Sequence, residues 1–141
     1  EIEKGEINID GHNTKEVPIY DLRDKITVIT QEACLFTGSL RFNLDPKGQH
    51  SDEEMLALLK RAGLEELLKR DKVDEKKKKK GGKKEEKPKE GLDVEINEGG
   101  GNLSSGEKSL LGICRAILRK NKIILLDEAT ANIDIKTEKK I

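Results

Sequence analysis

Two adjacent carboxylates, Asp127 and Glu128, follow the wholly apolar run Ile123–Leu126. Such a run is typical of a parallel strand covered on both faces, and open α/β sheets bind ligands at the carboxyl ends of their strands. In that place Asp127 could hold Mg²⁺, directly or through water, while Glu128 turns into the loop and deprotonates an attacking water. The alternative is a strand-end acid that caps the next turn.

A second polar cluster, made of Ser104, Ser105, Gly106 and Glu107, stands at the expected start of a helix. Its structural interpretation is a capping box, in which Ser104 accepts from the backbone and Glu107 reaches back. The functional interpretation uses the same geometry. Free N–H groups at a helix N-terminus, a glycine that allows close approach and two hydroxyls form an anion site suited to a phosphate.

The N-terminal part of the chain has the pattern of a sheet. Alternating residues over 7–9 lead into the turn signal Asp10-Gly11, and we expect strands and turns throughout residues 1–30. The β-branched run 26–29 predicts another strand. Gln31 comes directly after it, where a lone Gln is typically a solvated loop residue and gains meaning only from its neighbours.

Helix signals begin at Ser51, which forms a capping box with Glu54, after a stretch of mixed composition at 35–46. We expect Gly63 to end this helix and a short second helix to follow at 64–68. The expected apolar stripe of the first helix consists of Met55, Leu56, Leu58, Leu59 and Ala62.

A lysine- and glutamate-rich run at 69–91 holds 12 basic and 6 acidic residues and one apolar residue, Val73. Such a run cannot bury a face, so we expect a disordered insertion. The whole chain is neutral, with 28 basic and 28 acidic residues, because the acidic remainder balances this run. The balance argues against a broad basic face, and we expect no nucleic-acid partner.

An alternating segment at 92–96 and a glycine-rich turn at 99–101 precede a helix expected from Ser105 to about Lys120. The expected apolar face of this helix consists of Leu110, Leu111, Ile113, Cys114, Ile117 and Leu118.

The remaining composition bounds the class of protein. The two cysteines have no metal-type spacing, which favours a reduced, cytosolic chain without a disulfide scaffold or structural zinc. The longest apolar stretch, 55–59, is far shorter than the roughly 20 residues of a membrane helix. The chain has no initiator Met, and we expect it to be a piece of a longer protein.

Seven segments, taken in order, resemble the nucleotide-binding domain of an ATP-binding cassette (ABC) transporter. They are IDG at 9–11, DLR at 21–23, ITVITQ at 26–31, LFTGSLRFNLDP at 35–46, GGNLSSGEKSLL at 100–111, RAILRK at 115–120 and IILLDEATANID at 123–134. The residues of the fourth and fifth segments are most similar to those of the second cassette of the C subfamily, the multidrug-resistance-associated exporters.

The resemblance implies an α/β fold: a P-loop NTPase-type ABC ATPase domain, incomplete, with a helical subdomain. Four parts are then expected along the chain. They are N-terminal strands of the core up to the Q-loop at 1–31, the helical subdomain at 32–68, the disordered insertion at 69–91, and the signature, Walker B and D-loop region at 92–141.

The resemblance also implies roles for single residues. Gln31 matches the Q-loop glutamine, which contacts Mg²⁺ and the attacking water and senses the transmembrane domain. Leu103 to Glu107 match the signature motif, which contacts the γ-phosphate of an ATP held by the opposite cassette. Asp127 matches the Walker B aspartate and Glu128 the catalytic glutamate, and Asp134 of the D-loop matches a residue of the dimer interface.

The chain also departs from the family pattern. No G-x-x-x-x-G-K-[ST] motif occurs, and we expect the chain to begin just after the Walker A helix. We expect it to stop before the switch histidine, because His12 and His50 lie too early to match that residue. Ser105 and Glu107 replace the commoner Gly and Gln of the signature, a variation that the C subfamily shows. This chain alone is therefore expected to lack half of each nucleotide site.

For the parent protein, the resemblance implies ATP-driven export of a solute by two cassettes that sandwich two ATP molecules. It implies ATP and Mg²⁺ as cofactors, with no other metal. The implied partners are a second nucleotide-binding domain and transmembrane domains, at the cytoplasmic face of a multi-pass membrane protein.

Two alternatives stay open at this point. One is a nucleotide-gated regulatory cassette without significant turnover, although an intact Glu128 favours hydrolysis. The other is an interaction module whose lysine run binds polyanions. The charge balance argues against it, because acidic residues interrupt the run and the rest of the chain is acidic; those in the run include Glu85, Glu86 and Glu90.

Overall fold

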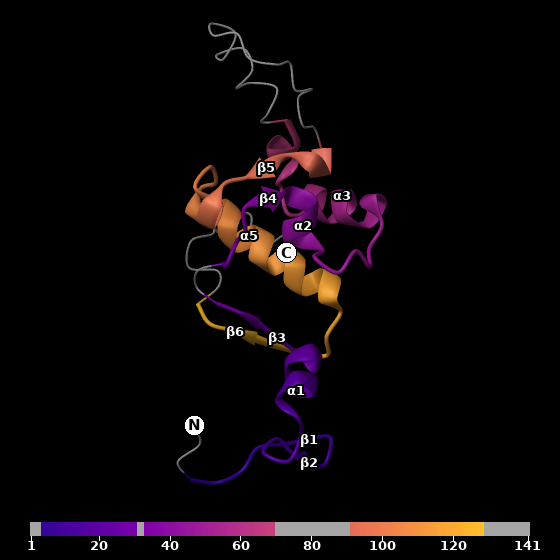
Figure 1. The fold of residues 1–141 in the computed structure, drawn as a ribbon, viewed down its shortest axis with the longest axis vertical. Coiled ribbons are helices and arrows are strands. Elements are labelled where there is room, and N and C mark those ends of the chain that lie inside the picture. The colour runs from indigo at the N-terminus through magenta and orange to yellow at the C-terminus, as the bar shows by residue number, and fades with distance from the viewer. Residues whose placement is uncertain (1–3, 31–32, 70–90, 129–141) are drawn as a thin grey trace, which may run out of the picture.

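In a computed structural model of the chain, residues 4–30, 33–69 and 91–128 are described. The predictions for Gln31, for residues 70–90 of the insertion expected at 69–91 and for Asp134 lie outside the described residues. The two end residues of that insertion, Lys69 and Gly91, are ordered in 3₁₀ turns. The described part contains a small parallel sheet and a helical layer, with one long helix, α5, packed against both (Figure 1).

The chain begins with a hairpin of strands β1 (Asn8–Ile9) and β2 (His12–Asn13). Asp10 and Gly11 at its turn have φ of 49° and 80°, as the two central residues of a type I′ turn require. The sequence prediction of a strand and turn here is confirmed.

Helix α1 (Ile19–Lys25) contradicts the expectation of strands and turns throughout residues 1–30. It follows Pro18, has Asp21 in its first turn and has two cations in its last turn, so its charges suit the helix dipole. No residue of α1 is buried, which explains why hydrophobic periodicity did not indicate it.

The parallel sheet consists of β3 (Ile26–Ile29) and β6 (Ile123–Leu126), in the register Ile26 to Ile123 through Ile29 to Leu126. Both strands lie where the sequence predicts them. Asn121 fixes the beginning of the pair, since its amide nitrogen donates to the carbonyl of Asp24 at 3.0 Å and to the hydroxyl of Thr27 at 2.9 Å.

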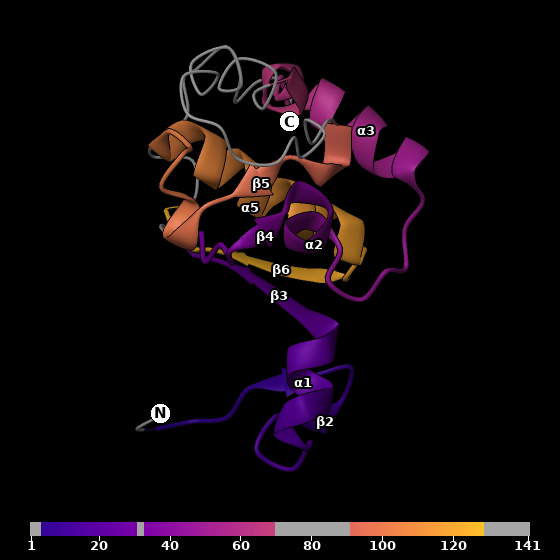
Figure 2. The same cartoon turned by 45° about the horizontal axis from the view of Figure 1, so that its top comes forward.

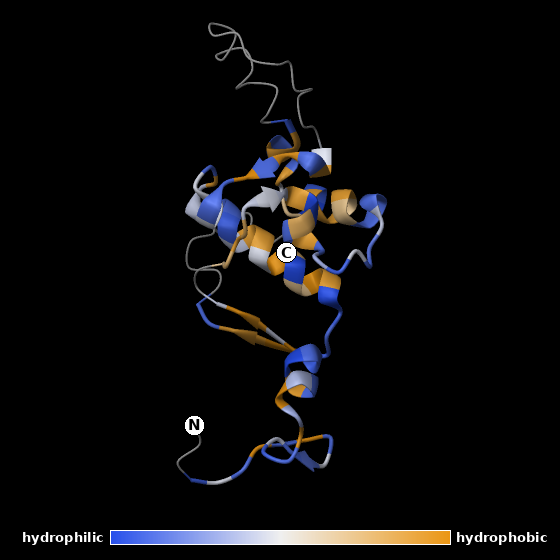
Figure 3. Cartoon of the chain, in the orientation of Figure 1, coloured by the Kyte–Doolittle hydropathy of each residue, from blue (hydrophilic) through white to orange (hydrophobic). Residues whose placement is uncertain are grey.

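The prediction that the apolar strand at 123–126 is covered on both faces is wrong within this chain. Helix α5 (Ser105–Arg119) covers one face, where Ile29 packs with Ile113 and Ala116. Val28 and Leu125 are paired in the register and remain 57% and 52% exposed, because no described element covers the other face. Figure 3 shows both strands as strongly hydrophobic.

The helical layer lies on the other side of α5 from the sheet (Figure 2). Its elements are β4 (Gly38–Ser39), α2 (Leu40–Leu44), α3 (Asp52–Arg61), β5 (Glu95–Ile96) and the 3₁₀ turns η1 (Glu65–Lys69), η2 (Gly91–Asp93) and η3 (Glu98–Gly100), with β4 and β5 paired antiparallel. One apolar core joins this layer to α5, and its fully buried members include Leu40, Met55, Leu59, Leu67, Ile96 and Leu111.

Most of the helix predictions are confirmed. The Ser51–Glu54 capping box opens α3, and α5 begins and ends within one residue of its expected bounds. Two residues of the expected apolar faces, Leu56 and Ile117, are instead 37% and 40% exposed. The segment 92–96 forms a 3₁₀ turn before a two-residue strand.

Candidate functional site

The polar cluster at the start of α5 forms the predicted capping box. The hydroxyl of Ser104 accepts from the backbone N–H of Glu107 at 3.3 Å, and the carboxylate of Glu107 accepts from the N–H of Ser104 at 2.8 Å. Leu103 is buried beneath the turn, whereas Ser105 is exposed and Gly106 is partly exposed. The capping interpretation is therefore confirmed, whereas the anion-site interpretation of the same residues stays a prediction.

The loop that leads into α5 is fixed by an asparagine and a glycine. The side chain of Asn102 accepts from the N–H of Asn97 at 3.0 Å and donates to the carbonyl of Glu95 at 2.8 Å. Gly100 has φ of 69°, and a Cβ at this position would stand 2.7 Å from a methyl of Leu35. A residue with a side chain at position 100 would therefore be strained both by its left-handed backbone conformation and by its contact with Leu35.

The two carboxylates lie at the carboxyl end of the parallel pair. The backbone N–H of Asp127 donates to the carbonyl of Ile29 at 2.9 Å, which continues the ladder one step beyond Leu126. Both carboxylate residues are exposed. Asp127 therefore stands beside the end of β3, the strand that leads to Gln31, although Gln31 itself is not among the described residues.

Glu128 leaves the strand in a left-handed backbone conformation, with φ of 47°. Holding a residue other than glycine in the left-handed region costs of order 1–3 kcal/mol, and such conformations are concentrated at functional sites. The backbone therefore leaves the extended conformation at Glu128, and the alternation of the strand no longer fixes the direction of its side chain. The role predicted for this carboxylate stays a prediction.

The start of α5 lies on the same side of the molecule as the end of β6, after which Asp127 and Glu128 follow in the chain (Figure 1, Figure 2). Helix α5 runs away from that side and β6 returns to it, as both views show (Figure 1, Figure 2). A helix N-terminus suits phosphate oxygens, and exposed carboxylates suit a metal and a water.

Sequence reasoning missed Arg115, a partly buried cation on α5. Its guanidinium donates to the carbonyl of Asn43 at 2.7 Å and to the carbonyl of Cys34 at 2.8 Å. Burial lowers the pKa of Arg115 from its ordinary value. A charged residue inside the expected apolar face of the helix was the signal that could have revealed it.

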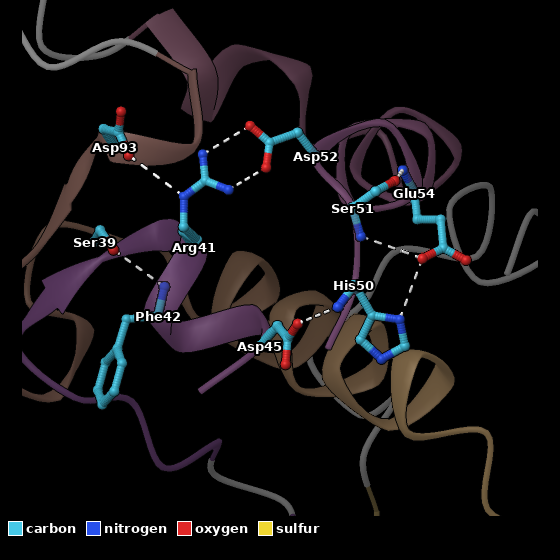
Figure 4. Close-up of polar contacts among 9 residues, drawn as sticks. All are labelled: Ser39, Arg41, Phe42, Asp45, His50, Ser51, Asp52, Glu54 and Asp93. Carbon is cyan, nitrogen blue, oxygen red and sulfur yellow. Dashed lines mark hydrogen bonds and ion pairs between the residues drawn. The ribbon is translucent and has the colours of Figure 1, made fainter. Parts of the chain in front are cut away.

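Another polar network joins the helices of the helical layer (Figure 4). Arg41 binds the carboxylate of Asp52 through two nitrogens and lies 3.6 Å from Asp93. The hydrogen bond from Arg41 holds the pKa of Asp52 below its ordinary value. This network connects α2, α3 and η2 and contains none of the predicted site residues.

A cavity of about 520 Å³ lies at the other end of the sheet, among the hairpin, α1 and the start of β6. Its lining residues include His12, Lys25 and Asn121, and none of the predicted site residues. Over 4–30, 33–69 and 91–128, no cluster of three His, Cys, Asp or Glu residues is arranged to hold a metal. Within the same ranges, no helix has the length and apolarity needed to cross a membrane.

The chain is similar to a known protein family, to longer relatives and to a solved structure. The family model described as "ABC transporter" matches residues 1–131. ATP-binding cassette sub-family C member 3 of Homo sapiens is 40% identical over 138 residues, and member 2 of Homo sapiens is 42% identical over 134. These alignments cover 98% and 95% of the chain but only 8% of each relative, so the chain spans a small part of their length.

A solved structure, described as a bacterial Atm1-family ABC exporter with ATP bound, shares the fold. The TM-score is 0.77 at 29% sequence identity, and the match covers 99% of this chain and 22% of that one. The α/β fold expected from the sequence is therefore confirmed.

Proposed function

This chain belongs to the ABC transporter family, and on that premise we propose that it forms part of an ATP-hydrolysing cassette that powers export of a solute across a membrane. The observation that carries the proposal is the parallel pairing of β3 with β6. That pairing ties Asp127 to Ile29, and so brings the carboxylates to the end of the strand that leads to Gln31.

We assign Glu128 the role of general base. Its carboxylate would accept a proton from a water as the water oxygen attacks the γ-phosphorus of ATP and the bond to the bridging oxygen of ADP breaks. The positive φ of Glu128 supports this role, because the chain leaves the extended conformation at this residue, directly after a strand end of the kind where open α/β sheets bind ligands.

Asp127 would hold Mg²⁺, which neutralises charge on the phosphates when bound. A single exposed carboxylate fits this ion, since Mg²⁺ is commonly held by one or two carboxylates together with substrate phosphates and water. Gln31 is proposed as a further contact to Mg²⁺ and to the attacking water.

Ser104, Ser105, Gly106 and Glu107, with Leu103 beneath them, are proposed to bind the γ-phosphate of an ATP held by a second cassette. The exposure of Ser105 at the start of α5 supports a ligand that arrives from another domain. Asp134 would then lie at the contact between the cassettes. The partners are thus a second nucleotide-binding domain and transmembrane domains, and the cassette would sit at the cytoplasmic face of a multi-pass membrane protein.

A matched pair of substitutions in the complete protein tests these roles. Glu128→Gln keeps size and hydrogen-bonding reach but cannot accept the proton, and we expect hydrolysis about 10²–10⁴-fold slower with ATP binding retained. Asp127→Asn should instead weaken Mg²⁺-dependent ATP binding. Single-turnover hydrolysis and nucleotide binding measured on both variants separate the two roles.

If Glu128→Gln hydrolyses ATP as fast as the parent, the general-base assignment is wrong. The nucleotide-gated regulatory cassette would then be preferred. No observation on the described residues favours that alternative, and the intact carboxylate of Glu128 supports turnover.

A further inference from the structure

Arg115 connects three segments of the chain. It lies on α5, roughly two turns beyond Glu107, the last of the signature residues, and its guanidinium donates to the backbones of two other parts of the chain. Nε donates to the carbonyl of Asn43 at 2.7 Å, one terminal nitrogen donates to the carbonyl of Cys34 at 2.8 Å, and the other lies 3.5 Å from Oδ1 of Asn43. One side chain therefore holds both ends of the segment 34–43 against α5.

Asn43 continues this connection into the same segment. It is only 2% exposed, and its Oδ1 accepts from the N–H of Phe36 at 2.9 Å. Its Nδ2 donates to the carbonyls of Phe36 at 2.8 Å and Ser39 at 3.1 Å. Arg115 thus also supports, through Asn43, the backbone at Phe36, five residues after Gln31.

A helical glycine brings the segment close to α5. Gly112 lies one turn before Arg115, and a Cβ at this position would stand 3.2 Å from the Cβ of Ala33. Glycine is unfavourable inside a helix, so its place in α5 is explained by this close approach. Ala33, Cys34 and Phe36 are accordingly held to α5 directly or through Asn43.

We propose that Arg115 is a positioning residue for ATP hydrolysis, which fixes the segment after Gln31 to the helix that carries the signature residues. The inference rests on the proposed function, because it assigns Arg115 the task of keeping two parts of the nucleotide machinery in one geometry. Only a planar guanidinium presents donors in a fork toward several acceptors at once. A lysine keeps the charge but not this geometry.

The test compares Arg115→Lys with Arg119→Lys in the complete protein. Arg119 is the matched control, because it lies one turn further along α5 and is exposed. For Arg115→Lys we expect kcat for ATP hydrolysis to fall about tenfold or more while KM for ATP stays within about threefold, since only the alignment of bound groups is lost. For Arg119→Lys we expect both constants to stay within twofold.

Hydrogen exchange gives a readout that does not depend on hydrolysis. In Arg115→Lys, amides in a peptide covering 33–44 should exchange at least about fivefold faster, whereas those of α3 (52–61) should keep their rates. Faster exchange in both peptides, or unchanged exchange in the first, overturns the proposal.

A second variant guards against failure of Arg115→Lys to fold. Gly112→Ala leaves Arg115 in place and adds a methyl where Ala33 approaches, so it should lower kcat severalfold and speed exchange only over 33–44. A parent protein that does not hydrolyse ATP contradicts the proposed function. A hydrolysing parent in which Arg115→Lys behaves like Arg119→Lys, or in which Gly112→Ala leaves kcat and exchange unchanged, contradicts this inference alone.

Discussion

Leu67 and Leu92, which stand near the two ends of the lysine-rich run, are buried in one apolar core with 1% and 4% of their surface exposed. Both ends of the run are therefore anchored by packing that does not require the run itself. The 3₁₀ turns that carry these leucines, η1 and η2, lie in contact.

We predict that replacing residues 70–90 by a short Gly/Ser link in the complete protein leaves ATPase activity within a few-fold. Surface loops cost little in stability, roughly 0.6 kcal/mol for each doubling of length. The measurement is the steady-state ATPase rate of the parent and the replacement. A large loss would mean that the lysines contact a partner or an anionic lipid surface.

The two cysteines should differ strongly in reactivity. Cys34 is exposed, whereas Cys114 is 1% exposed and its burial raises the pKa of its thiol to about 12. Because the thiolate is the nucleophile, an alkylating reagent near pH 8 should modify Cys34 at least about tenfold faster. Mass spectrometry of the labelled peptides measures both rates. Equal rates would contradict the burial of Cys114.

The sequence was informative where one physical signal decided the local structure. Two capping boxes, at Ser51 and Ser104, marked the starts of the two longest helices among the described residues, and the turn signal Asp10-Gly11 marked the hairpin. The β-branched and apolar runs gave both strands of the parallel pair. In each case the signal involved neighbours within four residues.

Features that depend on long-range contacts were not accessible in this way. Helix α1 has no buried face, so it leaves no periodic pattern. The support of Asn43 by Arg115 joins residues 72 positions apart, and nothing in the local sequence of either indicates the other. The exposure of Leu125 depends on which elements cover the sheet, and the apolar pattern alone cannot report it.

The capping box of α3 should make the helix sensitive to acid. The backbone N–H of Ser51, then Lys120 and His50, lower the pKa of Glu54 below its ordinary value of 4.5. A lowered folded-state pKa means that the stabilisation is complete above about 4.5 and is lost as pH falls through the folded value. Glu54→Gln should therefore destabilise α3 near neutral pH and match the parent in acid.

Hydrogen exchange of the α3 peptide, corrected for the intrinsic pH dependence of exchange, measures this difference. Glu53→Gln is the matched control, because Glu53 is exposed on the same first turn. The control loses only the interaction of a first-turn charge with the helix dipole, so its gap from the parent near neutral pH should be smaller than that of Glu54→Gln. A constant gap between Glu54→Gln and the parent down to about pH 3 would show that the carboxylate charge is not the cause.

The 141-residue chain by itself should bind ATP weakly or not at all. In P-loop enzymes, backbone N–H groups and the lysine of the Gly-rich loop make most contacts to the triphosphate, and this sequence contains no G-x-x-x-x-G-K-[ST] motif. The residues that we propose for nucleotide binding, among them Ser104 and Asp127, would contact only the terminal phosphate and its metal. Isothermal titration of the chain with Mg-ATP should give no micromolar affinity, whereas the complete protein should bind. Micromolar binding by the chain alone would mean that its own helix N-terminus and carboxylates form a nucleotide site without that loop.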